Sequence, residues 1–174
     1  MKHLRFLFAL FAVVAAVGAK AQVTPASMTA EWQRAKAYTK EYLDAMPADK
    51  YSLKPTPEMR SFAAQMLHLT DANYFFTSMV TGKPSPMGNN SAEKTVPQTK
   101  EATTKAVMDS YDYVINAIQG MTPDQLNQMA KMQNKEYSKE TLFNKAFEHQ
   151  THHRGQTTVY LRLAGVTPPQ EKLF

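Results

Sequence analysis

The sequence contains no cysteine, one tryptophan and only six glycines in 174 residues. The absence of cysteine excludes disulfide bonds, thiolate metal ligands and thiol chemistry by the protein itself, and it argues against a bacterial lipoprotein anchor. There is no basic stripe with interleaved aromatic residues, so nucleic acid is not an expected partner. What the sequence does have is 43% apolar residues, which is enough for one buried core in a domain of ordinary size.

Residues 1–21 have the layout of a secretory signal peptide. Lys2 and Arg5 precede an apolar run, FLFALFAVVAAV, that is shorter than the roughly 20 residues a membrane-spanning helix needs. The small residues Ala19 and Ala21 stand at the −3 and −1 positions of a cleavage site. We therefore predict that this leader is removed and that the mature chain is exported, to a periplasm or to the medium, without stable insertion in a membrane.

Residues 22–174 are predicted to form one all-α domain. Removal of the leader takes away three basic residues and no acidic one, so the net charge falls from +5 to +2. Four stretches place apolar residues at helical spacing, and none shows the sustained alternation of a strand. The predicted helices cover about 29–46, 57–81, 100–119 and 138–165, with a short capped helix after Thr122. Helices and loops of these lengths predict an up-down four-helix bundle.

Three of the five histidines fall in the segment HQTHHRGQ, as His149, His152 and His153. His149 and His153 are four residues apart on one inward seam of the last predicted helix, whereas His152 points to the edge of that seam and is expected to be exposed. Two imidazoles at this spacing can bind one cation from one face of a helix, and a third ligand is expected from a facing helix. His68 is the remaining candidate, since it lies in the apolar stripe of the second predicted helix while His3 belongs to the leader.

A single buried histidine is more often a hydrogen-bonded core residue than a metal ligand, and that interpretation stays open for each histidine alone. Three buried imidazoles without a cation, however, need partners for six ring nitrogens. This requirement favours a metal site formed by His68, His149 and His153. Gln156 and Asp71 lie one helical turn from these histidines, so we predict that they orient an imidazole.

Two further residues of the last predicted helix suggest structural roles. Gly155 inside a helix costs about 1 kcal/mol relative to alanine, which predicts that a neighbouring helix approaches closely there. Arg154 is predicted to pair with an acidic residue of another helix or of the C-terminal segment, in preference to binding substrate.

Two segments, KPTPEMRSFAAQMLHLTDANYFF and EHQTHHRGQTTVYLRLAGVTPP, resemble the signatures of the DinB/YfiT-like family of four-helix bundles. The resemblance covers essentially residues 32–169. In the second segment the matching residues are His149, His153, Arg154, Gly155, Gln156, Tyr160, Leu161, Arg162, Gly165, Pro168 and Pro169. In the first segment they are Lys54, Pro55, Arg60, Ser61 and His68.

The resemblance implies that one histidine of the second helix and two of the fourth bind a divalent metal, which assigns His68, His149 and His153 as ligands. Zinc is the metal expected here, with nickel, manganese and iron as alternatives, and pairing into a homodimer is also implied. Some members are thiol transferases that work in the cytosol with a small thiol, and others resemble hydrolases or isomerases.

We therefore expect an exported metal-dependent hydrolase, or a thiol or other group transferase, that acts on an unidentified small molecule. The alternatives are a non-catalytic bundle that binds a metal or ligand, and a purely structural helical module that dimerises.

Overall fold

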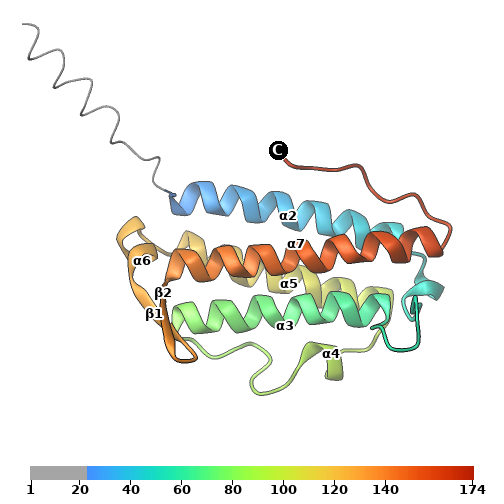
Figure 1. Ribbon diagram of the computed structural model, residues 1–174, viewed down its shortest axis with the longest axis horizontal. Helices are drawn as coiled ribbons and strands as arrows, with labels where there is room; N and C mark the ends of the chain where they lie inside the picture. Colours follow the sequence, from blue (N-terminus) through green and yellow to red (C-terminus); the bar gives the residue numbers. More distant parts are fainter. Residues whose placement is uncertain (1–22) are drawn as a thin grey trace, which may run out of the picture.

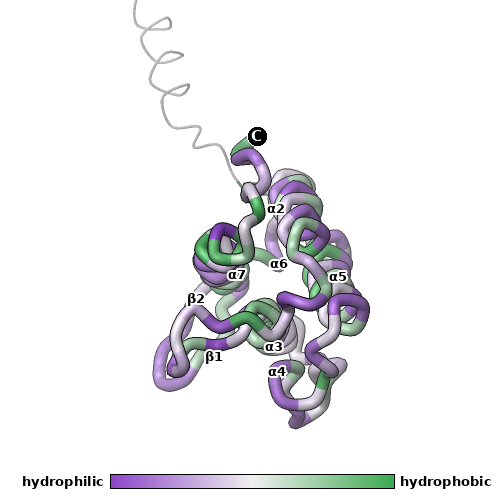
Figure 2. Tube along the Cα trace, turned by 90° about the vertical axis from the view of Figure 1, so that its right-hand side faces the viewer, coloured by the Kyte–Doolittle hydropathy of each residue, from purple (hydrophilic) through white to green (hydrophobic). Residues whose placement is uncertain are grey.

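The computed structural model describes residues 23–174, so the predicted leader lies outside the described part of the chain. The fold is mostly helical, and four long helices lie side by side (Figure 1). These are α2 (Pro25–Ala45), α3 (Phe62–Thr81), α5 (Lys100–Gln119) and α7 (Lys139–Leu163). Seen along their axes, they surround a common core (Figure 2). No helix within residues 23–174 is long and apolar enough to cross a membrane.

Short elements connect the long helices. They are the 3₁₀ turn η1 (Ala48–Lys50), α4 (Ala92–Thr95), α6 (Pro123–Asn127) and two strands, β1 (Met129–Met132) and β2 (Lys135–Ser138). The strands form an antiparallel hairpin in which Met129 pairs with Ser138. The prediction of a purely helical domain is therefore wrong at this point. Each strand has only four residues, and a segment that short carries too little alternation to reveal a strand.

Side-chain caps set the ends of the helices. Thr24 and Ser27 form a capping box, with Pro25 as the first helical residue, so α2 begins four residues before the predicted start. The Ser61 hydroxyl accepts a hydrogen bond from Ala64 N, so α3 begins after the predicted start near residue 57. At its other end α3 stops at Gly82, whose φ of 70° suits glycine.

The second and third long helices run in the same direction. Lys100, the first residue of α5, donates hydrogen bonds to the carbonyl oxygens of Asp44 and Met46, at the end of α2. Ser61, at the start of α3, donates to the side chain of Gln98, just before α5, at 2.6 Å. Both helices thus begin at the end of the bundle where α2 finishes (Figure 1).

The first and last long helices also run parallel to each other. Trp32, early in α2, packs edge-on against Phe147, early in α7. The hydroxyl of Tyr42, near the end of α2, lies 3.1 Å from the hydroxyl of Thr158, in the later part of α7. The four helices therefore do not alternate in direction, as the predicted up-down order requires. The reason is the long connection 82–99, which returns the chain along the bundle before α5 begins (Figure 1).

Helix α3 packs against both α5 and α7 and is buried on most of its circumference. Met66, Leu69 and Thr77 are almost completely inaccessible. The apolar stripe predicted to contain His68 instead lies at the edge of this buried surface, and Phe75, two turns further along α3, is 54% exposed. This edge position leaves His68 partly accessible from solvent.

Candidate metal centre

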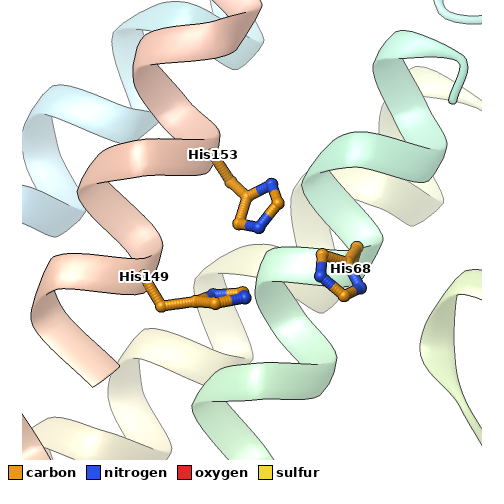
Figure 3. Close-up of side chains that lie close together, drawn as sticks. All are labelled: His68, His149 and His153. Atoms are coloured by element: carbon orange, nitrogen blue, oxygen red, sulfur yellow. The ribbon is translucent and has the colours of Figure 1, made fainter. Parts of the chain in front are cut away.

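The structure brings the three predicted histidines together. His68 projects from α3, and His149 and His153 project from α7 toward it (Figure 3). One ring nitrogen of each lies within 4.8 Å of one ring nitrogen of the other two. The ring centroids are 5.2 Å apart for His68 and His149, 4.6 Å for His68 and His153, and 4.3 Å for His149 and His153. Within residues 23–174 this is the group of side chains suited to hold a metal ion.

Two rigid helices set this geometry. The spacing of four residues stacks His149 and His153 on one face of α7, and α3 runs antiparallel to that face. The end of α7 is tied to the start of α3, because the Tyr160 hydroxyl donates to the carbonyl oxygen of Arg60 at 2.9 Å. This contact sets the position of His68 relative to the pair along the bundle axis.

Electrostatics keep the three imidazoles neutral. Burial, together with the repulsion between neighbouring charged histidines, lowers the pKa of His149 to about 4 and that of His153 to about 3. The pKa of His68 is also lowered, first by burial and then by the nearby Arg60 guanidinium, against the opposing effect of Glu93. A neutral imidazole has a free lone pair, which is the form that binds a metal.

Two of the three Nδ1 atoms have a neighbouring polar side chain, and the third has no hydrogen-bond partner among the described residues. His68 Nδ1 lies 3.5 Å from Oε2 of Glu93, and His153 Nδ1 lies 2.9 Å from the side-chain nitrogen of Gln65. His149 Nδ1 is buried and has no hydrogen-bond partner within residues 23–174. A buried nitrogen without a partner is costly, and a metal ion bound by Nδ1 would satisfy it. The donor set of three imidazoles therefore fits a divalent transition metal.

The two residues predicted to orient an imidazole form their hydrogen bonds with residues outside the trio. Asp71 accepts hydrogen bonds from the Ser91 hydroxyl and from the backbone nitrogens of Ala92 and Glu93. It therefore holds the start of α4, and through α4 it holds the carboxylate that faces His68.

Gln156 reaches the trio through another glutamine. Its side chain contacts that of Gln65, and Gln65 contacts His153. The other end of the Gln156 amide lies 2.9 Å from Nε2 of His152. As predicted, His152 is exposed and stands outside the trio.

The sequence did not reveal the residues that touch the trio directly, Gln65 and Glu93. Gln65 is one helical turn before His68, so helical spacing alone places the two residues side by side on α3. Glu93 comes from the connection 82–99, where no periodic pattern exists. It also forms an ion pair with Arg60, at 2.9 Å from Nε to Oε1.

A surface hollow of about 500 Å³ opens beside the trio. Its lining is mainly polar and consists of Glu58, Met59, Arg60, Gln65, Glu93, Gln156 and Tyr160. Because Gln65 and Glu93 contact two of the histidines, a small molecule in this hollow would lie next to the candidate metal centre.

The structure revises the predictions for Arg154 and Gly155. No acidic residue within 23–174 forms an ion pair with Arg154, which is buried and lies over the Tyr38 ring at 4.5 Å. Gly155 is exposed, and a Cβ built there would meet no atom of a neighbouring helix within 4 Å. The expected close approach at Gly155 is therefore absent in the described structure.

Comparison with known proteins agrees with this architecture. A DinB-like protein from Bacillus cereus has a similar fold, with a TM-score of 0.77 and 20% sequence identity over 87% of this chain and 99% of the other. A DinB-like protein from Bacillus subtilis superposes with a TM-score of 0.67 and 20% identity, over 84% of this chain and 96% of the other. No curated protein sequence matches the chain. The sequence model of the DinB family matches residues 19–173, and the chain therefore belongs to the DinB family.

Proposed function

We propose that this protein binds one divalent metal through His68, His149 and His153 and uses it in hydrolysis, or in transfer of a thiol or other group, on a small molecule. The observation that carries the proposal is the convergence of three neutral imidazoles, with His149 Nδ1 buried and unpartnered in the described structure. Zinc is the first candidate because it prefers nitrogen ligands and tolerates three protein ligands with an open position. Nickel, manganese and iron are the alternatives.

Such a metal, when bound, supplies a Lewis acid that lowers the pKa of a bound water or thiol and polarises a carbonyl group. The residues of the chain provide the surroundings. The hollow beside the trio offers the Arg60 guanidinium, the Glu58 carboxylate and the Gln156 amide to a substrate. A lining of this kind suits a small polar molecule better than an extended apolar one.

Export belongs to the same proposal and rests on the sequence of residues 1–21. An exported enzyme would act outside the cytosol, where small cytosolic thiols are scarce, so hydrolysis is the favoured reaction. Pairing into a homodimer is carried over from the family resemblance alone.

A second candidate function is metal or ligand binding without turnover. It is favoured by the state of Glu93, the carboxylate next to the trio, whose two oxygens already face Arg60 and His68. A carboxylate engaged in this way is poorly placed to act as a general base.

The test is elemental analysis of the protein beginning at Gln22, purified without a histidine tag. One first-row transition metal per chain is expected in the parent. The metal should be lost in His68→Ala and retained in His152→Ala, which removes a neighbouring but exposed histidine. A parent that takes up no metal even after reconstitution would refute the proposal. Turnover of ester, amide or thiol-transfer substrates by the loaded protein, lost in His68→Ala, would then separate the enzyme from the non-catalytic binder.

A further inference from the structure

We propose that Glu93 and Gln65 are positioning residues that keep the proton of His68 and of His153 on Nδ1, so that both Nε2 atoms are available to the metal. The proposal rests on the metal-binding function above and assigns roles to two side chains outside the trio. It makes the connection 82–99 part of the metal centre, although that segment contributes no ligand.

The first step concerns His68 and Glu93. A neutral imidazole carries one proton, either on Nδ1 or on Nε2, and a carboxylate can only accept a hydrogen bond. Oε1 of Glu93 is taken by Arg60, so Oε2 is the oxygen that faces His68 Nδ1 at 3.5 Å. This arrangement favours the proton on Nδ1 and frees the lone pair of Nε2, as in other carboxylate–histidine–metal arrangements.

The second step concerns what holds Glu93 in place. Helix α4 has only four residues, and a helix that short is not stable by itself. The Asp71 carboxylate accepts hydrogen bonds from Ser91 Oγ at 2.6 Å, Ala92 N at 2.5 Å and Glu93 N at 3.2 Å. Asp71 thereby anchors the start of α4 to α3, one turn away from His68. The Glu93 side chain is thus fixed both through its own backbone and through Arg60.

The third step concerns His153 and Gln65, which is only 3% exposed. The amide nitrogen of Gln65 lies 2.9 Å from His153 Nδ1, an arrangement in which Nδ1 accepts and the proton is on Nε2. A half-turn of the amide places its oxygen there instead, because the two ends of an amide have similar shapes. The oxygen then accepts from Nδ1–H and leaves Nε2 free for the metal.

This reversal is compatible with the contacts of Gln65 and Gln156 with each other and with His152. Gln65 contacts Gln156, which in turn lies 2.9 Å from Nε2 of His152. After a matching half-turn, Gln156 donates to the Gln65 oxygen, which has two lone pairs, and accepts from Nε2–H of His152. Metal binding therefore selects one of two directions of the same hydrogen-bond chain.

The experiment compares the zinc affinity of four variants and two controls, by competition with a chromogenic chelator. Glu93→Ala and Gln65→Met are each expected to weaken zinc binding by about 10- to 100-fold. Asp71→Ala should also weaken it, because Glu93 loses its anchor. Gln65→Glu presents only acceptors to His153 and should keep the affinity within about threefold of the parent.

The controls are matched to the variants. Glu58→Ala removes a carboxylate from the same hollow that forms no ion pair with the trio in the described structure. Gln150→Met removes another buried glutamine of the bundle, whose oxygen accepts from Tyr111 and Arg154. Both should bind zinc within about threefold of the parent. Thermal unfolding of each variant verifies that it is folded under the conditions of the titration.

A second readout measures the proton positions directly, by the nitrogen chemical shifts of the imidazoles in NMR. In the metal-free parent His68 should carry its proton on Nδ1, and in Glu93→Ala it should become a mixture of both forms. Parent-like zinc affinity in both Glu93→Ala and Gln65→Met, or a metal-free parent with the His68 proton on Nε2, would overturn the inference. If the parent bound no zinc, the proposed function would fail, while the His68 shifts would still decide the role of Glu93.

Discussion

Helix α7 contributes to two polar clusters, the histidine trio that it shares with α3 and a cluster around Arg154 that it shares with α2 and α5. In the Arg154 cluster the Gln150 oxygen accepts from Arg154 at 3.0 Å and from the Tyr111 hydroxyl at 2.7 Å. The Tyr111 hydroxyl also lies 2.7 Å from the Thr39 hydroxyl, and the guanidinium stacks on Tyr38. No buried side-chain nitrogen or oxygen of these five residues lacks a partner in the described structure.

The histidine trio differs in this respect. One ring nitrogen, His149 Nδ1, is buried without a partner, and a polar hollow opens beside the cluster. The Arg154 cluster is complete in the protein alone and therefore serves the fold. The histidine cluster keeps a nitrogen that no residue within 23–174 satisfies, and its three imidazoles converge on one point, which fits the proposed metal site. The two clusters differ in burial as well, because the Arg154 cluster is buried whereas His68 and His149 are only partly buried.

The largest expected difference between the two clusters lies in how a substitution changes the affinity for zinc. His149→Leu should weaken binding of zinc by more than about 100-fold, because a direct ligand contributes more than the outer contacts do. The same variant should raise the free energy of unfolding of the metal-free protein by about 1 kcal/mol, since an apolar side chain replaces an unpartnered nitrogen. Zinc titration and urea unfolding check the two effects, and retained zinc binding would remove His149 from the site.

Arg154→Met should produce the opposite pattern. The free energy of unfolding is expected to fall by about 2 kcal/mol through loss of charged hydrogen bonds and of the contact with Tyr38. Zinc affinity should stay within about twofold of the parent, because the guanidinium faces α2 and not the trio. Urea unfolding with a parallel zinc titration measures both quantities. A large loss of zinc affinity in a stably folded variant would show that the two clusters are coupled.

Acid should affect the trio in the metal-free protein. The pKa values of about 4 for His149 and about 3 for His153 lie below the ordinary value of 6.5. Between these values and 6.5 the unfolded chain binds protons that the folded chain does not. Stability is therefore fully present above pH 6.5 and declines as the pH falls toward 4 and then 3.

Urea unfolding of the metal-free protein at about pH 7 and about pH 5 measures this decline. It should be smaller in His149→Leu, which has lost one of the two strongly shifted imidazoles. Equal declines in parent and variant would mean that other groups cause the acid sensitivity.

The smallest effect is expected at Gly155, on the exposed side of α7. Gly155→Ala should raise the free energy of unfolding by up to about 1 kcal/mol, because glycine is a poor helix former and the added methyl group meets no neighbour. Zinc affinity should not change. A destabilised Gly155→Ala protein would indicate that a second molecule packs closely at this position.

Much of the candidate site was predictable because it depends on local geometry. The spacing of His149 and His153 places both on one face of a helix whatever the rest of the fold is. His68 was found because a histidine in an apolar helical stripe is unusual. Gln65 was available to the same reasoning, one turn before His68. Glu93 was not, because it reaches the trio only through the path of the connection 82–99 and the anchor at Asp71.

The fold, like the site, has parts that the sequence predicted and parts that it did not. The structure confirms the predicted helix starts near residue 138 and after Thr122, and the predicted helix end at residue 81. The direction of α5 and the hairpin between β1 and β2 were not predictable, because a connection of given length can end at either end of a bundle and two four-residue strands carry little pattern.

By itself, the sequence determined four amphipathic helices, a pair of histidines on one helix face and a third histidine on another helix, since these follow from the periodicity of the backbone. The tertiary structure alone decided that the three imidazoles meet, that one of their nitrogens is left without a partner among the described residues, and that Glu93 and Gln65 stand behind two of them. The physical reason is that contacts between residues distant in the chain depend on how helices are directed and packed, and local patterns carry no information about either.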